Sequence, residues 1–389
     1  MGAAFALGND GRVTQPEEHE VQGADAVAED AEHLSWAERP PTRRSLVMSG
    51  AGLVTALLFA VLAVAPSPYA IGRPGPTYDT LSVVGDTPLV SISGAPTYPT
   101  TGELRLTTVS ESRGGSQVFT VGQVIAAYFS RQATVLPEEA VFGTPADRDQ
   151  QQDASSQEWI TSQESATVAA LEALGTTVPA TLTVVSVDAA SHATGILEAG
   201  DVLLAADGGD LVGYNDLAAA VARHEAGQTL ALTIERAGVT RDVDVTLLAS
   251  DDGRPLIGIL VDPTFDLPVD VHVAIDSVGG PSGGTMFALA IMDLLTPQDE
   301  LQGAKVAGTG TIDISGAVGP IGGIRLKMVG AANDGARYFL APTSNCGEVV
   351  GHIPAGLDVY AVSTLDEAYA AIQAIGQQHT AGLATCANP

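Results

Sequence analysis

Two glycine-rich stretches decide how this sequence is interpreted: GGPSGGT at residues 279–285 and GPIGGIRLK at residues 319–327. The first contains Ser282, and the second contains Lys327, one of only two lysines beside fifteen arginines. Lysine can lose its proton at accessible pH, whereas arginine effectively cannot. A neutral amine beside a serine hydroxyl acts as a general base. The two stretches therefore predict a serine nucleophile with a lysine base.

The serine stretch lies between a predicted strand and a predicted helix. The alternating run PVDVHVAIDSV at residues 268–278 predicts the strand, and an apolar helix begins near Ser282. Ser282 is then either an ordinary N-cap, which accepts an amide hydrogen bond, or a reactive group. Flanking glycines favour the second interpretation, because they let a substrate approach while amides at the helix start stabilise an oxyanion. The candidate oxyanion loop consists of Gly280, Pro281 and Gly283.

The lysine stretch predicts a strand, a hairpin turn, a glycine corner and a helix. Lys327 falls in the first turns of this helix, where the positive end of the helix dipole disfavours an ammonium. Burial beside Ile324 and Met328 would lower its pKa further. The alternative is a surface lysine whose stem lies along an amphipathic helix. Its rarity and the glycine corner favour the buried base.

The composition excludes several classes of protein. The net charge of -29 argues against a nucleic-acid binder, because no basic surface is available to neutralise phosphates. Neither lysine lies in a GxxxxGK[ST] phosphate loop, so we expect no ATPase domain and no use of ATP. We also expect no cofactor and no metal. The 389 residues are enough for about two domains of ordinary size.

A long uncharged stretch precedes the part of the chain that carries these motifs. Residues 46–65, LVMSGAGLVTALLFAVLAVA, are numerous enough to cross a bilayer as a helix. Three arginines lie just before it, Arg39, Arg43 and Arg44. Only Arg73 follows closely, so the positive-inside rule places the N-terminus in the cytoplasm and the catalytic part outside it. The alternative is a signal peptide cleaved near Pro66.

The two ends of the chain carry further predictions. Residues 1–45 are acidic and poor in large apolar residues, which is typical of a disordered tail. Cys346 and Cys386 lie in the part expected outside the cytoplasm, where disulfides persist. We expect a bridge that closes a loop of about forty residues. Two free, buried thiols are the alternative.

The stretch between the anchor and residue 180 has mixed patterns. Short alternating runs between residues 74 and 121 predict strands that could pack on either later domain. A polar tract at residues 144–158, TPADRDQQQDASSQE, separates two helical patterns and predicts a solvated loop. The assignment of residues 74–180 to a domain therefore stays open.

Residues 181–249 form a distinct unit in the sequence. Alternating apolar strands surround one helical pattern, NDLAAAVARH, and a turn of the form G-x-L-x-x-G-D begins at Gly195. This order resembles the PDZ domains of bacterial proteases. Such domains bind extended peptides by adding a strand to a sheet edge, so the resemblance implies peptide capture.

The peptide-binding loop of this domain has two candidates. One is the turn that contains Gly195, Ile196 and Leu197, and the other is PLIGIL at residues 255–260. A spacer without binding function is the alternative for the whole domain.

The two glycine-rich stretches also carry a resemblance. They look like the serine and lysine motifs of the Lon-type peptidase domain, in the same order and at a similar spacing. Together with the apolar stretch and the PDZ-like unit, residues 46–375 resemble the membrane-anchored PDZ-Lon proteins of Gram-positive bacteria, including actinobacteria. The resemblance implies Ser282 as nucleophile, Lys327 as general base, and Thr309 of AGTGTID as a threonine that helps to hold the lysine.

This chain departs from classical Lon-type sequences in two ways. Those have Asp-Gly-Pro-Ser-Ala-Gly around the nucleophile, whereas this chain has Gly279 in place of the acid and Gly283 in place of the alanine. They also carry an ATPase, so the resemblance implies that substrates of this chain arrive unfolded or flexible. Some Lon-type domains assemble as rings, and a homo-oligomer is left open here.

The expected architecture is multidomain, with one transmembrane helix, a β-rich PDZ-like domain and an α+β Lon-type domain. Its parts are a cytoplasmic tail (1–45), a transmembrane helix (46–65), a linking region (74–180), a PDZ-like domain (181–249), a peptidase domain (255–375) and a C-terminal tail (376–389).

The expected function is an ATP-independent serine endopeptidase that cleaves extracytoplasmic peptides or unfolded proteins, anchored in a lipid bilayer. Three alternatives are an anchored PDZ scaffold with an inactive Lon-like domain, a structural component of the cell envelope, and a trypsin-like enzyme. The last would need a histidine in a triad. His272 lies on the alternating run and is expected to be a core or edge residue instead.

Overall fold

The computed structural model describes residues 42–85, 87–112, 119–130, 132–143, 148–250, 253–275 and 278–387. The chain divides into two compact units, Met1–Leu62 and Ala63–Pro389. Helix α1 (Arg43–Val64) makes up nearly all of the described part of the first unit and ends just inside the second.

Among the described residues, α1 is the one helix long and apolar enough to cross a membrane. It has 22 residues, which correspond to about 33 Å at 1.5 Å per residue, close to the ~30 Å hydrocarbon core of a bilayer. Its large side chains are exposed, Leu53 and Phe59 among them. The helix predicted at residues 46–65 is confirmed. Residues 1–41 of the predicted tail (1–45) lie outside the described residues. Residues 43–45 belong to α1.

One six-stranded sheet joins distant parts of the second unit, in the order β20-β19-β16-β5-β1-β6. Its strands are β1 (Tyr69–Asp79), β5 (Glu103–Ser112), β6 (Thr134–Pro137), β16 (Lys305–Gly308), β19 (Tyr338–Pro342) and β20 (Asp358–Val362). β16 pairs in parallel with β5 and with β19, whereas β1 pairs antiparallel with β5 and β6. Half of the strands therefore precede the PDZ-like region in the sequence and half follow it.

This sheet settles the part of residues 74–180 that the sequence left unassigned. β1, β5 and β6 belong to the same sheet as β16, β19 and β20, which follow the serine motif in the sequence. The predicted peptidase domain of residues 255–375 thus contains only three of the six strands of this sheet, β16, β19 and β20. Alternation of apolar residues marks a strand but not its partner, which is why the sequence could not show the pairing of β5 with β16.

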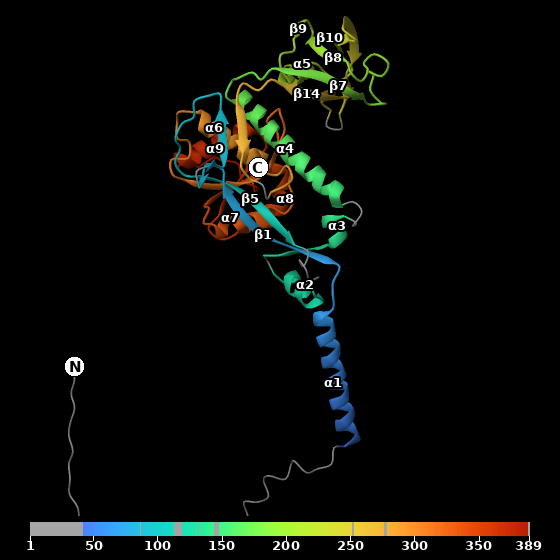
Figure 1. Ribbon diagram of the computed structural model, residues 1–389, viewed down its shortest axis with the longest axis vertical. Coiled ribbons are helices and arrows are strands. Elements are labelled where there is room, and N and C mark those ends of the chain that lie inside the picture. Colours follow the sequence, from blue (N-terminus) through green and yellow to red (C-terminus); the bar gives the residue numbers. More distant parts are fainter. Residues whose placement is uncertain are drawn as a thin grey trace, which may run out of the picture. The chain divides into compact units, whose positions relative to one another are not determined.

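Successive residues of these strands face opposite layers, because side chains alternate along a strand. Leu104 and Leu106 of β5 pack with helices α6 and α9, whereas Phe339 and Ala341 of β19 pack with α7 and α8. The helices are α6 (Gly284–Leu295), α7 (Ile324–Asn333), α8 (Cys346–Val349) and α9 (Leu365–Gly376). Figure 1 shows α6 and α9 on one side of β1 and β5, and α7 on the other.

The polar tract predicted as a loop is helical from Arg148 onward, because helix α4 spans Arg148–Ala173. From Trp159 onward the helix packs on α6, where Trp159 meets Phe287 edge to face with 5.2 Å between ring centroids. This packing stabilises a helix whose preceding turns are polar, so the tertiary contact overrides the local composition. The loop prediction was wrong for residues 148–158.

A second sheet has the order β11-β10-β8-β7-β14. Its strands are β7 (Ala180–Val187), β8 (Val202–Ala206), β10 (Thr229–Arg236), β11 (Val239–Thr246) and β14 (Ile259–Phe265), with helix α5 (Tyr214–Ala222) beside them. Fourteen buried apolar residues from these elements and the segments between them form a core of their own. β14 pairs antiparallel with β7 along its whole length, so this domain extends past the predicted end at 249 and includes residues 259–265.

The backbone conformation and the packing of the G-x-L-x-x-G-D turn explain its residue types. Gly195 and Gly200 have φ of 79° and 91°, a region that favours glycine. Leu197 is buried in the core. Asp201 is fully buried and accepts a hydrogen bond from the Glu198 amide. It also forms an ion pair with Arg236, with 2.6 Å between Arg236 Nε and Asp201 Oδ1. The Arg236 hydrogen bonds lower the pKa of Asp201.

The remaining elements are short. They are β2 (Val83–Val84), β3 (Thr87–Pro88), β4 (Val90–Ser93), α2 (Val121–Tyr128), α3 (Glu138–Phe142), β9 (Gly209–Asp210), β12 (Leu248–Ala249), β13 (Pro255–Leu256), β15 (Asp270–Val273), β17 (Thr311–Ile312), β18 (Val318–Gly319) and a 3-10 turn (Thr343–Asn345). β15 pairs with β4 and β17 with β18, so the segments before and after the serine motif are each held by a short ladder.

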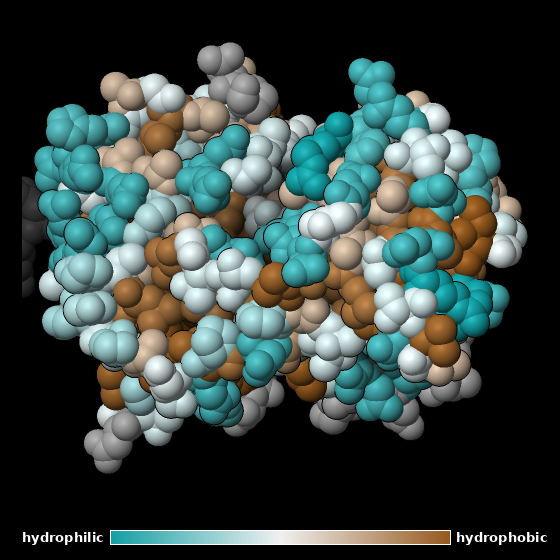
Figure 2. Space-filling model, turned by 90° about the horizontal axis from the view of Figure 1, so that it is seen from above, coloured by the Kyte–Doolittle hydropathy of each residue, from teal (hydrophilic) through white to brown (hydrophobic). Residues whose placement is uncertain are grey.

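Polar residues cover much of the surface. Figure 2 shows hydrophilic side chains over most of the viewed face, interrupted by smaller hydrophobic patches. The sequence carries 46 acidic residues against 17 lysines and arginines.

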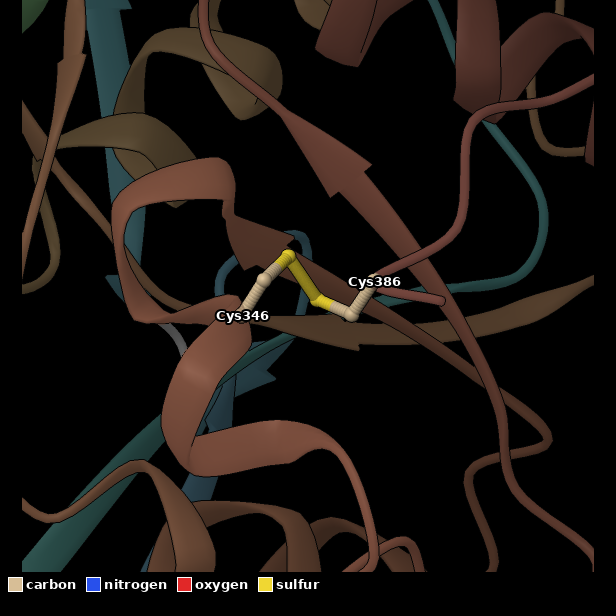
Figure 3. Close-up of a disulfide and its surroundings, with 2 residues drawn as sticks. All are labelled: Cys346 and Cys386. Atoms are coloured by element: carbon tan, nitrogen blue, oxygen red, sulfur yellow. A yellow bond between two sulfur atoms is a disulfide. The ribbon is translucent and has the colours of Figure 1, made fainter. Parts of the chain in front are cut away.

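Cys346 and Cys386 form a disulfide across 40 positions of sequence, as predicted (Figure 3). Cys346 opens α8, and the bridge fixes the C-terminal segment to it. Both cysteines belong to the buried cluster between α7 and β19. The bridge therefore packs in the same buried cluster as α7, the helix that carries Lys327.

We predict that the double variant Cys346→Ser/Cys386→Ser is less stable than the parent chain. A loop of this length contributes about 4 kcal/mol on the chain-entropy account. Thermal denaturation of both proteins measures the difference, and the reduced parent chain serves as a matched control. Equal melting temperatures for all three would show that the bridge does not stabilise the fold.

Candidate active site

Ser282 stands immediately before the first residues of α6. The N-cap of α6 is Gly283, and no side chain caps this helix end. The Ser282 hydroxyl oxygen instead accepts a hydrogen bond from Lys327 Nζ at 2.8 Å. The N-cap interpretation of Ser282 is therefore wrong, and its hydroxyl points at an amine.

Lys327 is the fourth residue of α7, which begins at Ile324. Its side chain is only 3% exposed, so it does not extend along a surface toward water. Its hydrogen-bond partners among the described residues are the hydroxyls of Ser282 and Thr309, at 2.8 and 2.9 Å, and neither is a carboxylate. Burial lowers the pKa of Lys327 to about 8, because it disfavours the charged ammonium. The amine is thus partly neutral near physiological pH.

Thr309 joins the serine and the lysine. It is fully buried directly after β16, and its Oγ1 donates to the Ser282 carbonyl at 2.9 Å while accepting from Lys327 Nζ. A hydroxyl has one donor and two acceptor positions, so both bonds can form together. The Gly310 amide also donates to the Ser282 carbonyl at 2.9 Å. The backbone of the serine is therefore held from the same strand end that orients the lysine.

The three residues of the predicted oxyanion loop differ in their hydrogen bonding. Gly280 adopts φ of 79°, and its amide donates to the Ser155 carbonyl at 3.2 Å, so that amide is already engaged. Pro281 has no amide hydrogen, and its carbonyl accepts from Ser162 Oγ at 3.1 Å. Gly283 is the N-cap of α6, where amides have no intrahelical partner. This leaves the amides of Gly283 and of Ser282 itself as the oxyanion donors that the geometry favours.

Helix α4 supports this loop, which the sequence did not reveal. Ser155 and Ser162 are spaced seven residues apart on α4 and bind Gly280 and Pro281 respectively. Ser155 in the polar tract and Ser162 in the helical pattern after it give no signal of such a role. Only the packing of α4 on α6 brings them to the loop.

The same helix explains one departure from classical Lon-type sequences. A Cβ added at Gly279 would lie 2.6 Å from Ser155 Oγ, so an aspartate there would displace the serine. At Gly283 an added Cβ would lie 3.0 Å from both Leu106 and Phe287, which leaves little room for alanine. The two glycines are thus matched to the close approach of α4 and β5.

His272 lies elsewhere in the arrangement. It is exposed on β15, paired opposite Ser91 of β4. It is an edge residue, one of the two places that the sequence predicted for it. No described group of histidines, cysteines and carboxylates could hold a metal ion.

A groove of about 900 Å³ lies beside the second sheet, between α5 and β14. Its wall includes Leu217 and Val221 of α5 and the segment of residues 254–261, and the turn of residues 313–315 adds to it. The PLIGIL stretch therefore lines the groove. Gly195, Ile196 and Leu197 do not, because Leu197 is buried in the core and the Ile196 carbonyl accepts a hydrogen bond from Arg236.

Comparison with protein families matches residues 259–374 to the Lon protease (S16) C-terminal proteolytic domain and residues 160–247 to the PDZ domain. The chain contains a Lon proteolytic domain and a PDZ domain. The Lon match includes the serine, threonine and lysine described above. The sheet shows in addition that strands from residues 69–137 complete the Lon domain of this chain.

Curated relatives that match part of this chain include Lon proteases. A Lon protease of Lachnoclostridium phytofermentans is 36% identical over 105 residues, 25% of this chain and 13% of that protein. The Lon protease of Escherichia coli K12 is 32% identical over 114 residues, 28% of this chain and 14% of that protein. This chain therefore spans about a seventh or less of the length of these relatives.

The solved structures that are similar to part of this chain include two PDZ domains. One is the PDZ domain of an SdrC-like protein from Listeria innocua, which is 27% identical and covers 21% of this chain and 92% of that one, with a TM-score of 0.20. Another, from Listeria monocytogenes, is 23% identical and covers 21% of this chain and 85% of that one, also with a TM-score of 0.20.

We predict that the Lys327 amine titrates near pH 8 in the folded chain. Selective ¹³C labelling of lysine gives only two side-chain signals, because the chain has two lysines. Lys327→Met, which keeps the length of the side chain, removes one signal and so assigns it. The signal that disappears should be the one that titrates near 8. Titration of that signal near the ordinary lysine value of 10.5 would contradict a buried, uncharged amine.

Proposed function

We propose that this chain is a membrane-anchored serine endopeptidase in which Ser282 is the nucleophile and Lys327 its general base. The observation that carries the proposal is the 2.8 Å hydrogen bond between Ser282 Oγ and the amine of a buried lysine with a lowered pKa. An amine that is partly neutral at physiological pH can accept the hydroxyl proton as the serine attacks.

The chemistry follows from this pair. Ser282 Oγ attacks a peptide carbonyl carbon, and its proton passes to Lys327 Nζ, while the amides of Ser282 and Gly283 bind the oxyanion. Collapse breaks the C–N bond, and the Lys327 ammonium returns the proton to the leaving amine. A water then attacks the acyl-enzyme with Lys327 again as base, which releases the acid and the free serine. Thr309 orients the amine throughout, since its hydroxyl bonds both the amine and the serine backbone.

The substrates that we propose are peptides or unfolded proteins, taken without ATP. Neither lysine of the sequence lies in a GxxxxGK[ST] phosphate-binding loop, which supports cleavage without ATP-driven unfolding. The PDZ groove between α5 and β14 supports capture of an extended segment, because β14 is an edge strand with a free side for pairing.

We propose that the catalytic domain lies outside the cytoplasm. Arg39, Arg43 and Arg44 precede the apolar helix, which favours a cytoplasmic N-terminus. The Cys346–Cys386 disulfide supports the same orientation, because disulfides persist in oxidising compartments.

A second candidate is an anchored PDZ scaffold whose Lon domain does not turn over. The apolar groove beside β14 favours it, because peptide binding there needs no chemistry at Ser282. The two proposals differ in one observable: only the enzyme makes products that depend on Ser282.

We predict that the full-length chain in nanodiscs cleaves an unfolded protein and a mixed peptide library, and that Ser282→Ala abolishes the cleavage. Mass spectrometry of the products gives the activity and its specificity. Any soluble fragment must begin at or before Pro66, because β1 starts at Tyr69 and pairs with β5.

Two controls accompany this test. Circular dichroism shows whether Ser282→Ala keeps the fold, which we expect because the hydroxyl is a small group at a half-buried site. Binding of library peptides to Ser282→Ala is measured in parallel. Binding by both chains without cleavage by either would support the scaffold and refute the peptidase.

The rate of cleavage should depend on pH in the direction that the lysine sets. As the pH falls below 8 the neutral fraction of the amine decreases, and only the neutral amine accepts the serine proton, so kcat/KM should fall about tenfold for each pH unit well below the pKa. Above that pKa the profile should level off. A profile that is flat from pH 6 to 10 would contradict Lys327 as base.

A further inference from the structure

The start of the short helix α2 lies in space beside the last residues of α1. The Val121 amide donates to the Ala65 carbonyl at 2.9 Å, and the Ser67 amide donates to the Phe119 carbonyl at 2.8 Å. A Cβ added at Gly122 would lie 3.0 Å from the Ala63 carbonyl oxygen, so the two segments touch. A capping box of Thr120 and Gln123 fixes the start of α2. The position of α2 at the last residues of α1 is therefore set by hydrogen bonds.

One face of α2 is apolar and exposed. Ile125, Tyr128 and Phe129 follow the helical spacing of three and four, with 47%, 76% and 81% of their surfaces exposed. Residues Val121–Tyr128 include no charged side chain. Ala127, on the other side, is buried, and α2 contacts β1 and β6. The helix is thus attached to the domain by one face and presents two aromatic rings with another.

The nature of the partner follows from what adjoins this face. If α1 crosses a bilayer, as the proposed function holds, its last residues lie at the boundary between hydrocarbon and headgroups, since its length matches the hydrocarbon core. The first residue of α2, Val121, is hydrogen bonded to Ala65, one residue beyond that end. Tyrosine and phenylalanine beside a span are typical of this boundary, where the ring sits among acyl chains and a hydroxyl reaches water.

We propose that α2 is an interfacial helix whose Ile125, Tyr128 and Phe129 lie in the headgroup region of the bilayer that α1 spans. The helix then fixes β1 and β6 against the membrane surface, because β6 follows α2 in the chain and pairs with β1. The partner is the lipid surface itself, not a second copy of the chain and not a peptide. The inference rests on the proposed membrane span but not on peptidase activity.

The test uses the full-length chain in nanodiscs with single cysteines that carry an environment-sensitive fluorophore. Both natural cysteines are in a disulfide, so only the introduced thiol reacts. The variants are Tyr128→Cys and Phe129→Cys, with Val239→Cys at the hairpin of the PDZ domain as an exposed apolar control. A fourth variant, Leu57→Cys within α1, reports on the span. Emission is recorded with lipids that carry a spin label at a shallow or a deep position.

We expect blue-shifted emission at residues 128 and 129 that shallow spin labels quench, water-like emission at residue 239, and quenching by deep spin labels at residue 57. Water-like emission at 128 and 129 with quenching at 57 would overturn the inference while the span stands. Blue-shifted emission at 128 and 129 that no lipid label quenches would mean that protein covers α2, and would also overturn it. Loss of quenching at all three positions would refute the span and the inference together.

Discussion

The pairing of β5 with β16 is the constraint on which the rest of the Lon domain depends. Glu103 to Leu106 run in parallel beside Lys305 to Gly308, and Thr107 Oγ1 donates to the Gly308 carbonyl at 2.9 Å. This ladder joins a strand that precedes the PDZ domain to one that follows it. Because β16 ends at Gly308, the ladder also fixes the residue after it, Thr309, which bonds both the serine backbone and the lysine amine.

Burial of Lys327 opposes the stability of the fold, and the same burial lowers the pKa of the amine beside Ser282. An ammonium without a carboxylate partner is disfavoured in a buried place, and the lowered pKa is the expression of that penalty. Two hydroxyls satisfy the amine, so it stays hydrogen bonded when it is neutral. The glycines around the serine belong to the same compromise. They allow α4 and β5 to approach the serine loop closely, and α4 in turn holds that loop by two hydrogen bonds.

The position of the PDZ domain in the chain follows from the same sheet. It lies between β6 and β16 in the sequence, so the strands of the Lon domain close around an inserted domain. The turn of residues 313–315, which lines the PDZ groove, continues the segment that begins at Thr309. A peptide in the groove would therefore contact a segment that also reaches the serine backbone.

The sequence by itself determined the chemical groups and the local elements. Two lysines in an acidic chain singled out Lys327, the flanking glycines singled out Ser282, and the apolar run and the G-x-L-x-x-G-D turn marked the helix and the PDZ domain, since these signals are local. Only the tertiary structure decided the partners. β1, β5 and β6 joined the Lon sheet, β14 joined the PDZ sheet, and residues 148–158 became helix. The physical reason is that strand partners and the packing of a polar helix depend on contacts between residues far apart in the chain, which no local pattern records.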